Sequence, residues 1–293
     1  MLKLPSFAKI NWTLRILGKR PDGYHEVATV LQSISLCDEL VFRLRDDNEI
    51  SLSCDDPTIP VDASNLIIRA SRALSGTRGA DIKLLKRIPA KGGLGGGSSN
   101  AAITLVALNA LWRLGLGTSD LSQIGSGLGA DVPFFFEGGT AVATGTGTEV
   151  ASVADVAKQW LLVVTPNASV STANAYAALN ARSLTTFDSL SILASSFTEP
   201  FSGDNSQWPL HNDFEGVIFE IKPEIRRAKF ALLEAGARNA LLAGSGSSVF
   251  GIFTDEAARD QALRNLRSET GWRVFACHTL SRGEYCQAIS TGA

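Results

Sequence analysis

A glycine-rich stretch, Pro89 to Ala102, has the residue types of an anion-binding loop. Its sequence is PAKGGLGGGSSNAA, with glycines at positions 92, 93, 95, 96 and 97 and then Ser98 and Ser99. Glycines let backbone N–H groups approach an anion without a Cβ in the way, and a helix that follows them presents unpaired N–H groups and a positive dipole end. A long apolar helix-like run follows at once, so the stretch is not a linker. Five glycines also exceed what a tight turn with a serine cap requires, so the stretch predicts a polyphosphate site.

The stretch departs from both common phosphate-loop templates. A P-loop has a lysine directly after its last glycine, whereas the lysine here, Lys91, precedes the glycines. A dinucleotide fingerprint needs a glycine five positions after its first one, and counting from Gly93 or Gly95 that position holds Ser98 or Asn100. The loop therefore indicates phosphate binding without indicating a reaction, and a tight strand-to-helix turn is the structural alternative.

The other reactive side chains give no sign of a metal centre or a disulfide framework. Three histidines and four cysteines include no C-x-x-C and no H-E-x-x-H spacing. A net charge of −2 argues against a nucleic-acid partner, which normally requires a basic face. No apolar run is long enough to span a membrane, and no signal-peptide pattern is found near the first residues. We therefore expect a cytoplasmic protein, monomer or homodimer, that binds a small molecule.

Two groups of elements must position the glycine loop. Strand patterns at 6–18, 39–44 and 49–54 are followed by a helix at 63–76, capped by Ser64 or Asn65, a strand at 80–90 and a buried helix at 99–117. A second half starts near Lys158 with a buried strand, and contains the loop-like stretch 195–213. It then alternates helices and strands up to residue 278. This order predicts an α+β fold of the split β-α-β kind, with domains 1–157 and 158–293.

Three separated stretches resemble, in order, the three motifs of the GHMP kinases, a superfamily of small-molecule kinases. They are PSFAKINWTLRILGKRPDGYHE at 5–26, PAKGGLGGGSSNAA at 89–102 and LLAGSGSSVFGIF at 241–253. The segments KRPDGYH, LGADVPFFFEGG and HNDFE resemble one branch in particular, whose substrate is a cytidine-diphosphate-linked methylerythritol of the non-mevalonate isoprenoid pathway. This resemblance implies ATP- and Mg²⁺-dependent phosphorylation of the 2-hydroxyl of the methylerythritol unit.

The resemblance also implies a particular two-domain architecture. ATP and substrate would bind in the cleft between the domains. The N-terminal α/β domain would contain a left-handed β-α-β crossover, and the C-terminal domain would be ferredoxin-like.

Two side chains match the catalytic pair of the family. Asp131, in GADVP, matches its catalytic aspartate, and Lys9 matches its paired lysine. Lys9 would keep Asp131 ionised and lower the cost of the developing alkoxide. Asn11 lies two residues after Lys9, hence on the same strand face, where it could bond the same part of the substrate. Taken alone, a turn-capping aspartate and a solvated strand lysine are the ordinary alternatives.

The resemblance assigns a second group of residues to the cytidine end of the substrate. Tyr24 would stack on the cytosine, His25 would read its edge, and Tyr176 is the candidate for the opposite face of the ring. The third motif, Gly244-Ser245-Gly246, would lie against the substrate's diphosphate, although a bare hairpin turn would have the same sequence.

The ATP side is assigned to the glycine loop and two further residues. Asn65 and Lys86 match positions near the adenine, with a helix cap and an exposed strand end as their alternatives. Lys91 stands where a small residue is expected. Ser98 or Ser99 would lie near the metal. The phosphates would be held by Pro89, Gly92, Gly93, Leu94, Gly95, Gly96, Gly97, Ser98 and Ser99.

Two other functions compete with this interpretation. Another GHMP kinase, acting on homoserine, mevalonate or a sugar, would not need the PDGYH segment with a second aromatic residue, since those substrates carry no nucleobase. A catalytically silent nucleotide-binding protein would not need both Lys9 and Asp131.

Overall fold

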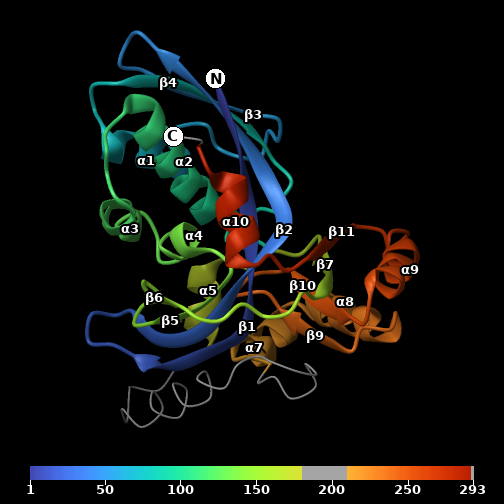
Figure 1. The fold of residues 1–293 in the computed structure, drawn as a ribbon. Coiled ribbons are helices and arrows are strands. Elements are labelled where there is room, and N and C mark those ends of the chain that lie inside the picture. Colours follow the sequence, from blue (N-terminus) through green and yellow to red (C-terminus); the bar gives the residue numbers. More distant parts are fainter. Residues whose placement is uncertain (180–209, 292–293) are drawn as a thin grey trace.

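The computed structural model describes residues 1–179 and 210–291, so most of the loop-like stretch predicted at 195–213 lies outside the described residues. Two long antiparallel strands, β1 (Leu2–Lys19) and β2 (His25–Arg45), form the spine of the first sheet and run through the length of the molecule (Figure 1). The turn predicted from Pro-Asp-Gly joins them, with Gly23 at a φ of 89°. The sheet has the order β3-β4-β2-β1-β8, and β5 and β6 extend it beside β2.

Helices cover this sheet and support the glycine loop. Strands β3 (Ile50–Cys54) and β4 (Gly79–Leu85) are parallel, and α1 (Leu66–Leu74) connects them as the predicted β-α-β unit. The loop follows β4 and leads into α2 (Gly96–Trp112), whose middle is buried, as its apolar sequence predicted. The remaining elements of this half are α3 (Thr118–Ser126), α4 (Phe134–Glu137), β5 (Thr140–Thr144) and β6 (Glu149–Ser152).

The second sheet has the predicted ferredoxin-like arrangement. Its strands have the order β11-β7-β10-β9, every neighbouring pair is antiparallel, and helices lie in the β7–β9 and β10–β11 connections. Its strands are β7 (Trp160–Pro166), β9 (Asn239–Leu242), β10 (Val249–Phe253) and β11 (Trp272–His278). The connections contain α5 (Thr172–Ala178), α7 (Phe214–Ile221), α8 (Pro223–Glu234) and α9 (Glu256–Leu266), while β8 (His211–Asn212) pairs with β1.

A shared core joins the two sheets. Trp12 and Ile34 of the first sheet are fully buried in one cluster with Leu161 and Phe250 of the second, and the rings of Trp12 and Phe250 meet edge to face at 5.8 Å. This continuous apolar contact fixes the two sheets relative to each other, and with them the walls of any site between them.

The last helix, α10 (Arg282–Ile289), returns to the first half of the chain. Tyr285 is completely buried there, and its hydroxyl donates a 2.6 Å hydrogen bond to the carbonyl of Phe135 in α4. Thus α10 packs on the first sheet although it lies far beyond residue 157, the domain boundary predicted from the sequence.

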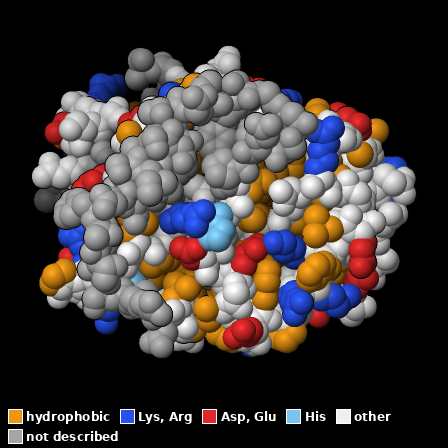
Figure 2. Space-filling model, turned by 90° about the horizontal axis from the view of Figure 1, so that it is seen from below, with side chains coloured by type: hydrophobic (Ala, Val, Ile, Leu, Met, Phe, Trp, Pro, Cys, Tyr) orange, Lys and Arg blue, Asp and Glu red, His pale blue; other side chains and the backbone are white. Residues whose placement is uncertain are grey.

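Two further properties concern the length of the helices and the distribution of surface charge. No helix within residues 1–179 and 210–291 is long and apolar enough to cross a membrane. Figure 2 shows one face of the molecule, on which acidic and basic side chains are interspersed and neither sign forms a continuous stripe.

We expect Tyr285→Phe to lower the free energy of unfolding by about 1–2 kcal/mol, because the buried Phe135 carbonyl loses its donor. Urea unfolding followed by circular dichroism measures this change. Tyr24→Phe is the matched control, since the Tyr24 side chain is exposed and its hydroxyl has water available. Equal stabilities of the two variants would contradict the assigned role of Tyr285.

Candidate active site

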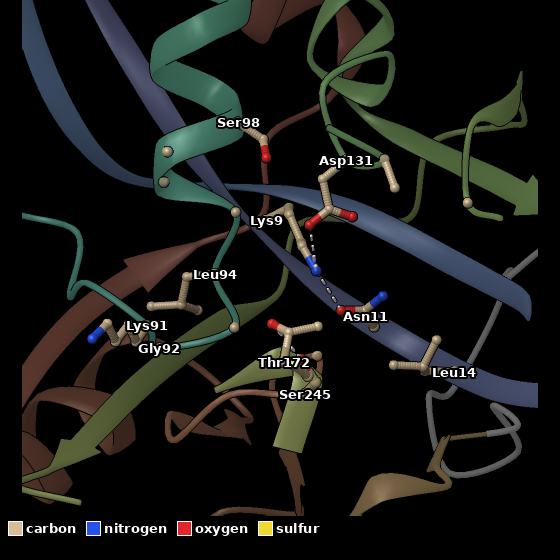
Figure 3. Close-up of a pocket in the computed structure, with 18 of the residues that line it drawn as sticks. Lys9, Asn11, Leu14, Lys91, Gly92, Leu94, Ser98, Asp131, Thr172 and Ser245 are labelled. Carbon is tan, nitrogen blue, oxygen red and sulfur yellow. Dashed lines mark hydrogen bonds and ion pairs between the residues drawn. The ribbon is translucent and has the colours of Figure 1, made fainter. Parts of the chain in front are cut away.

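A cavity of about 1040 Å³ lies where the glycine loop, the first two strands, the start of α2 and α5 meet. Its wall combines residues that are far apart in the chain: Lys9 and Asn11 of β1, Ser98 of α2, Asp131 before α4 and Ser245 after β9 (Figure 3). The structure therefore brings together the three motif regions singled out in the sequence.

An ion pair between Lys9 and Asp131 lies at the centre of this cavity. The Lys9 ammonium lies 3.4 Å from a carboxylate oxygen of Asp131, as the dashed line in Figure 3 shows. The lysine side chain is only 5% exposed, whereas that of Asp131 is 39% exposed. The carboxylate is thus open to a ligand, while the ammonium behind it is shielded from water, which strengthens its attraction for negative charge.

A chain of hydrogen bonds fixes the orientation of the Lys9 ammonium. It donates to the Asn11 amide oxygen at 2.9 Å, the Asn11 amide nitrogen donates to the Thr29 hydroxyl at 2.7 Å, and that hydroxyl donates to the Thr13 carbonyl at 2.7 Å. All four residues are buried. Sequence analysis found Asn11 but missed Thr29, for which the only signal is a polar residue within the apolar start of β2.

The glycine loop is held on both of its sides. The Lys9 backbone N–H donates to the Leu94 carbonyl at 2.9 Å, and the Ser248 backbone N–H donates to the Gly92 carbonyl at 3.1 Å. The loop is therefore bonded to β1 of the first half and to the third motif of the second half.

Several of the loop glycines are required by the protein's own packing. Gly93 and Gly95 have φ values of 78° and 70°. A Cβ on Gly93 would lie 1.8 Å from the Ala243 carbonyl oxygen, and one on Gly95 would lie 2.9 Å from Cγ of Lys9. The sequence argument that five glycines exceed a structural need was therefore too strong. Gly97, whose Cβ would meet only an ordinary contact at 3.7 Å, has no such constraint.

The first residues of α2 line the cavity. Its N-cap is Gly95, which has no side chain to bond the N–H groups of the first turn. Ser98 lines the cavity. Ser99 does not: it is fully buried, and its hydroxyl accepts a 2.8 Å hydrogen bond from Ser6. Of the two predicted serines, Ser98 alone therefore offers its side chain to a ligand or metal in this structure.

The two residues predicted near the adenine line the cavity, but both have partners within the protein. Asn65 caps α1 by accepting from the Ile67 N–H at 2.9 Å, so the helix-cap alternative is confirmed. Lys86 is not at an exposed strand end: its side chain is only 7% exposed, and its ammonium lies 2.8 Å from the Asp38 carboxylate. That carboxylate also accepts the Arg87 and Ile88 N–H groups, so it anchors the segment that leads into the glycine loop. A role for either residue at the adenine stays a prediction.

Three aromatic side chains gather at the other end of the cavity. The rings of His25 and Tyr176 lie against each other, tilted by 31° with centroids 4.7 Å apart, and Tyr176 meets Phe214 edge to face at 4.9 Å. Tyr24 is 66% exposed. The predicted clamp had Tyr24 and Tyr176 on opposite faces of a base, whereas here the ring against Tyr176 is His25. A clamp of a base between Tyr24 and Tyr176 stays a prediction.

Burial changes the acid–base properties of this aromatic group. It lowers the pKa of His25, with a smaller contribution from the positive charge of Lys19. It raises the pKa of Tyr176 to about 12, to which the negative charge of Asp131 adds. At neutral pH both rings are therefore uncharged.

The third motif forms the floor beneath the glycine loop. Asn212 donates to the carbonyls of Leu242 and Gly244 at 2.9 and 2.8 Å, which fixes the turn. Ser245 lines the cavity and donates to Thr172 at 3.2 Å. Gly246 does not line it: a Cβ there would lie 2.1 Å from the Gly93 nitrogen. Gly246 thus serves close packing against the loop, while Gly244 and Ser245, both predicted from the sequence, and Thr172, which sequence analysis missed, line the cavity.

The charge of the cavity wall favours an anionic ligand. Its lining includes Lys9, Lys19, Lys86 and Lys91, and one carboxylate, Asp131. Among the described residues, no group of three or more histidine, cysteine or acidic side chains could hold a metal ion.

Comparison with known proteins agrees with this geometry. Residues 65–139 match the GHMP kinases N terminal domain, and residues 193–271 match the GHMP kinases C terminal domain. A crystal structure of 4-(cytidine 5′-diphospho)-2C-methyl-D-erythritol kinase has a TM-score of 0.76 at 31% identity, over 95% of this chain and 99% of that one. The homoserine kinase of Cytophaga hutchinsonii, at 19% identity and a TM-score of 0.69 over 95% of both chains, shares the fold.

Two relatives found by sequence indicate a narrower family than the shared fold does. A 4-diphosphocytidyl-2-C-methyl-D-erythritol kinase of Syntrophotalea carbinolica is 44% identical over 92% of this chain and 95% of its own length. One of Pseudomonas syringae pv. syringae is 46% identical over 92% and 91%. Fold and site together thus define a small-molecule kinase of the GHMP type. Within that class, the chain belongs to the family of the 4-diphosphocytidyl-2-C-methyl-D-erythritol kinases.

We expect the His25 ring to titrate below its ordinary pKa of 6.5, and Tyr176→Ala to move it back upward by exposing one ring face. Histidine NMR titration of both proteins measures this. Because the unfolded chain then binds more protons than the folded one between the two pKa values, stability should fall as the pH drops below about 6.5. A His25 pKa at or above 6.5 in the unmutated protein would contradict the burial argument.

Proposed function

We propose that this protein transfers the γ-phosphoryl group of ATP to the 2-hydroxyl of 4-diphosphocytidyl-2-C-methyl-D-erythritol, in the non-mevalonate pathway to isoprenoid precursors. The observation that carries this proposal is the Lys9–Asp131 pair, which lies in one cavity with the glycine loop and with the aromatic group of His25 and Tyr176. The names of the relatives support the choice of substrate.

The Lys9–Asp131 pair supplies what transfer to an alcohol requires. The half-exposed Asp131 carboxylate orients the acceptor hydroxyl and takes its proton as the oxygen attacks the γ-phosphorus and ADP leaves. The shielded ammonium of Lys9 lies against the Asp131 carboxylate and stabilises the negative charge that develops on the oxygen. Asn11 and Thr29 hold that ammonium in place.

The glycine loop provides the ATP side of the cavity. Backbone N–H groups at the start of α2 and the dipole of that helix attract the phosphates. Mg²⁺ would neutralise part of the phosphate charge, and it fits a site where the chain offers the Ser98 hydroxyl while phosphate oxygens and water supply the other ligands.

The aromatic end of the cavity provides binding energy far from the reacting atoms. A cytosine ring would stack on this group and accept or donate hydrogen bonds at the neutral His25 ring. Such remote binding is used to orient the reacting hydroxyl. In this proposal the enzyme acts in the cytoplasm as a monomer or homodimer, and its near-balanced charge gives it no nucleic-acid partner.

The direct test is ADP release with ATP, Mg²⁺ and the cytidyl substrate, alongside homoserine and mevalonate. The cytidyl compound should be phosphorylated fastest. Faster turnover of homoserine or mevalonate would leave the GHMP class standing and would overturn the proposed substrate.

Asp131→Asn should lower kcat by at least about 100-fold while the protein stays folded, because the amide cannot take the proton. Steady-state ADP release and a thermal unfolding curve measure both properties. Asp46→Asn makes the same chemical change at an exposed position outside the cavity and should leave kcat unchanged. A kcat of Asp131→Asn within threefold of the unmutated enzyme would remove Asp131 from the mechanism.

A further inference from the structure

Lys91 has a backbone conformation that its residue type disfavours. Among the described residues, Lys91 and Arg113 are the two non-glycine residues with positive φ, at 57° and 54°. Residues other than glycine and asparagine rarely adopt this left-handed conformation, because their Cβ crowds the backbone. Arg113 has a structural reason, since it is the C-cap of α2, where helices commonly end in this conformation. Lys91 ends no helix.

Hydrogen bonds on both sides of the glycine loop explain why the backbone at position 91 is held in the left-handed region. The residue that follows, Gly92, is fixed by the Ser248 N–H, and a Cβ there would lie 2.5 Å from the Ser248 hydroxyl. Leu94 is fixed by Lys9. With the loop bonded on both sides, the turn at 91 cannot relax, and glycine is the residue that would satisfy it without strain. The packing of the loop therefore does not account for a lysine at this position.

The position and charge of the Lys91 side chain do account for a lysine at this position. It is exposed, it lines the cavity, and it forms no ion pair with any described carboxylate. In Figure 3 it extends from the loop on the side away from Lys9 and Asp131. Its charge is thus available to a ligand that lies along the loop, but it is remote from the atoms between which the phosphoryl group moves.

We propose that Lys91 is a nucleotide-affinity residue, whose ammonium binds phosphate oxygens of the nucleotide that are not transferred, and that its left-handed backbone is retained for this charge. This rests on the proposed function only in taking the ligand to be a nucleoside polyphosphate. Ammonium–phosphate contacts are charge-assisted, so their loss should weaken binding while the steps at Lys9 and Asp131 proceed as before.

The experiment separates charge from strain with three variants. Lys91→Gly removes both, Lys91→Met removes the charge and keeps the strain, and Arg113→Gly removes the same strain at the opposite end of α2, outside the cavity. Binding of ADP and of adenosine is measured by calorimetry, and thermal unfolding is measured without nucleotide.

We expect both Lys91 variants to bind ADP about tenfold more weakly, with adenosine binding unchanged. Lys91→Gly and Arg113→Gly should both raise the unfolding midpoint, and Arg113→Gly should bind ADP normally. Unchanged ADP affinity in Lys91→Gly, or an equal loss for adenosine, would overturn the assignment. If the unmutated protein itself bound no ADP, the proposed kinase function would be contradicted. This result is distinguishable from a failure of the Lys91 assignment alone.

Discussion

The buried ammonium of Lys9 is the constraint on which the site depends. Removing a positive charge from water is costly, and the charge persists only where carboxylate and amide oxygens surround it. Here Asp131 and Asn11 provide those oxygens, and Thr29 fixes Asn11 through a bond that crosses from β1 to β2. The long antiparallel pair of β1 and β2 thus positions the Asp131 carboxylate through Lys9.

The same lysine connects this charge to the phosphate side. Its backbone N–H bonds the glycine loop at Leu94, while its side chain fills the space that a Cβ on Gly95 would need. The third motif bonds the loop from the second sheet, and the shared core around Trp12 and Phe250 keeps the two sheets together. The loop, the ion pair and the floor of the cavity are therefore joined by direct contacts, which fix their relative positions as a transfer in line between two bound reactants requires.

Much of the fold could be predicted from local pattern, and most of the site could not. Helix α1 with its Asn65 cap, the buried α2 and the strand–helix order of the second half follow from periodicity and end signals. The meeting of Lys9 with Asp131 does not, because it depends on packing between segments 122 residues apart, and only the resemblance to GHMP kinases predicted it.

Fine details of side-chain direction were also beyond the sequence. Consecutive residues on a helix point about 100° apart, and this places Ser98 in the cavity and Ser99 in the core, a choice that the string SS cannot show. Asp38 was missed because a buried carboxylate is identified only by its partners. The contact of His25 with Tyr176 likewise depends on how the turn after β1 meets α5.

The measurement that tests this account most directly is a double-mutant cycle on Lys9 and Asp131, with kcat/KM for the cytidyl substrate determined for Lys9→Met, Asp131→Asn and the combination. If the two side chains act as one unit, the double variant should be no slower than the slower single variant, because either change already disables the pair. If the two fold-losses in kcat/KM multiplied in the double variant, the two side chains would act independently, and the account would be contradicted.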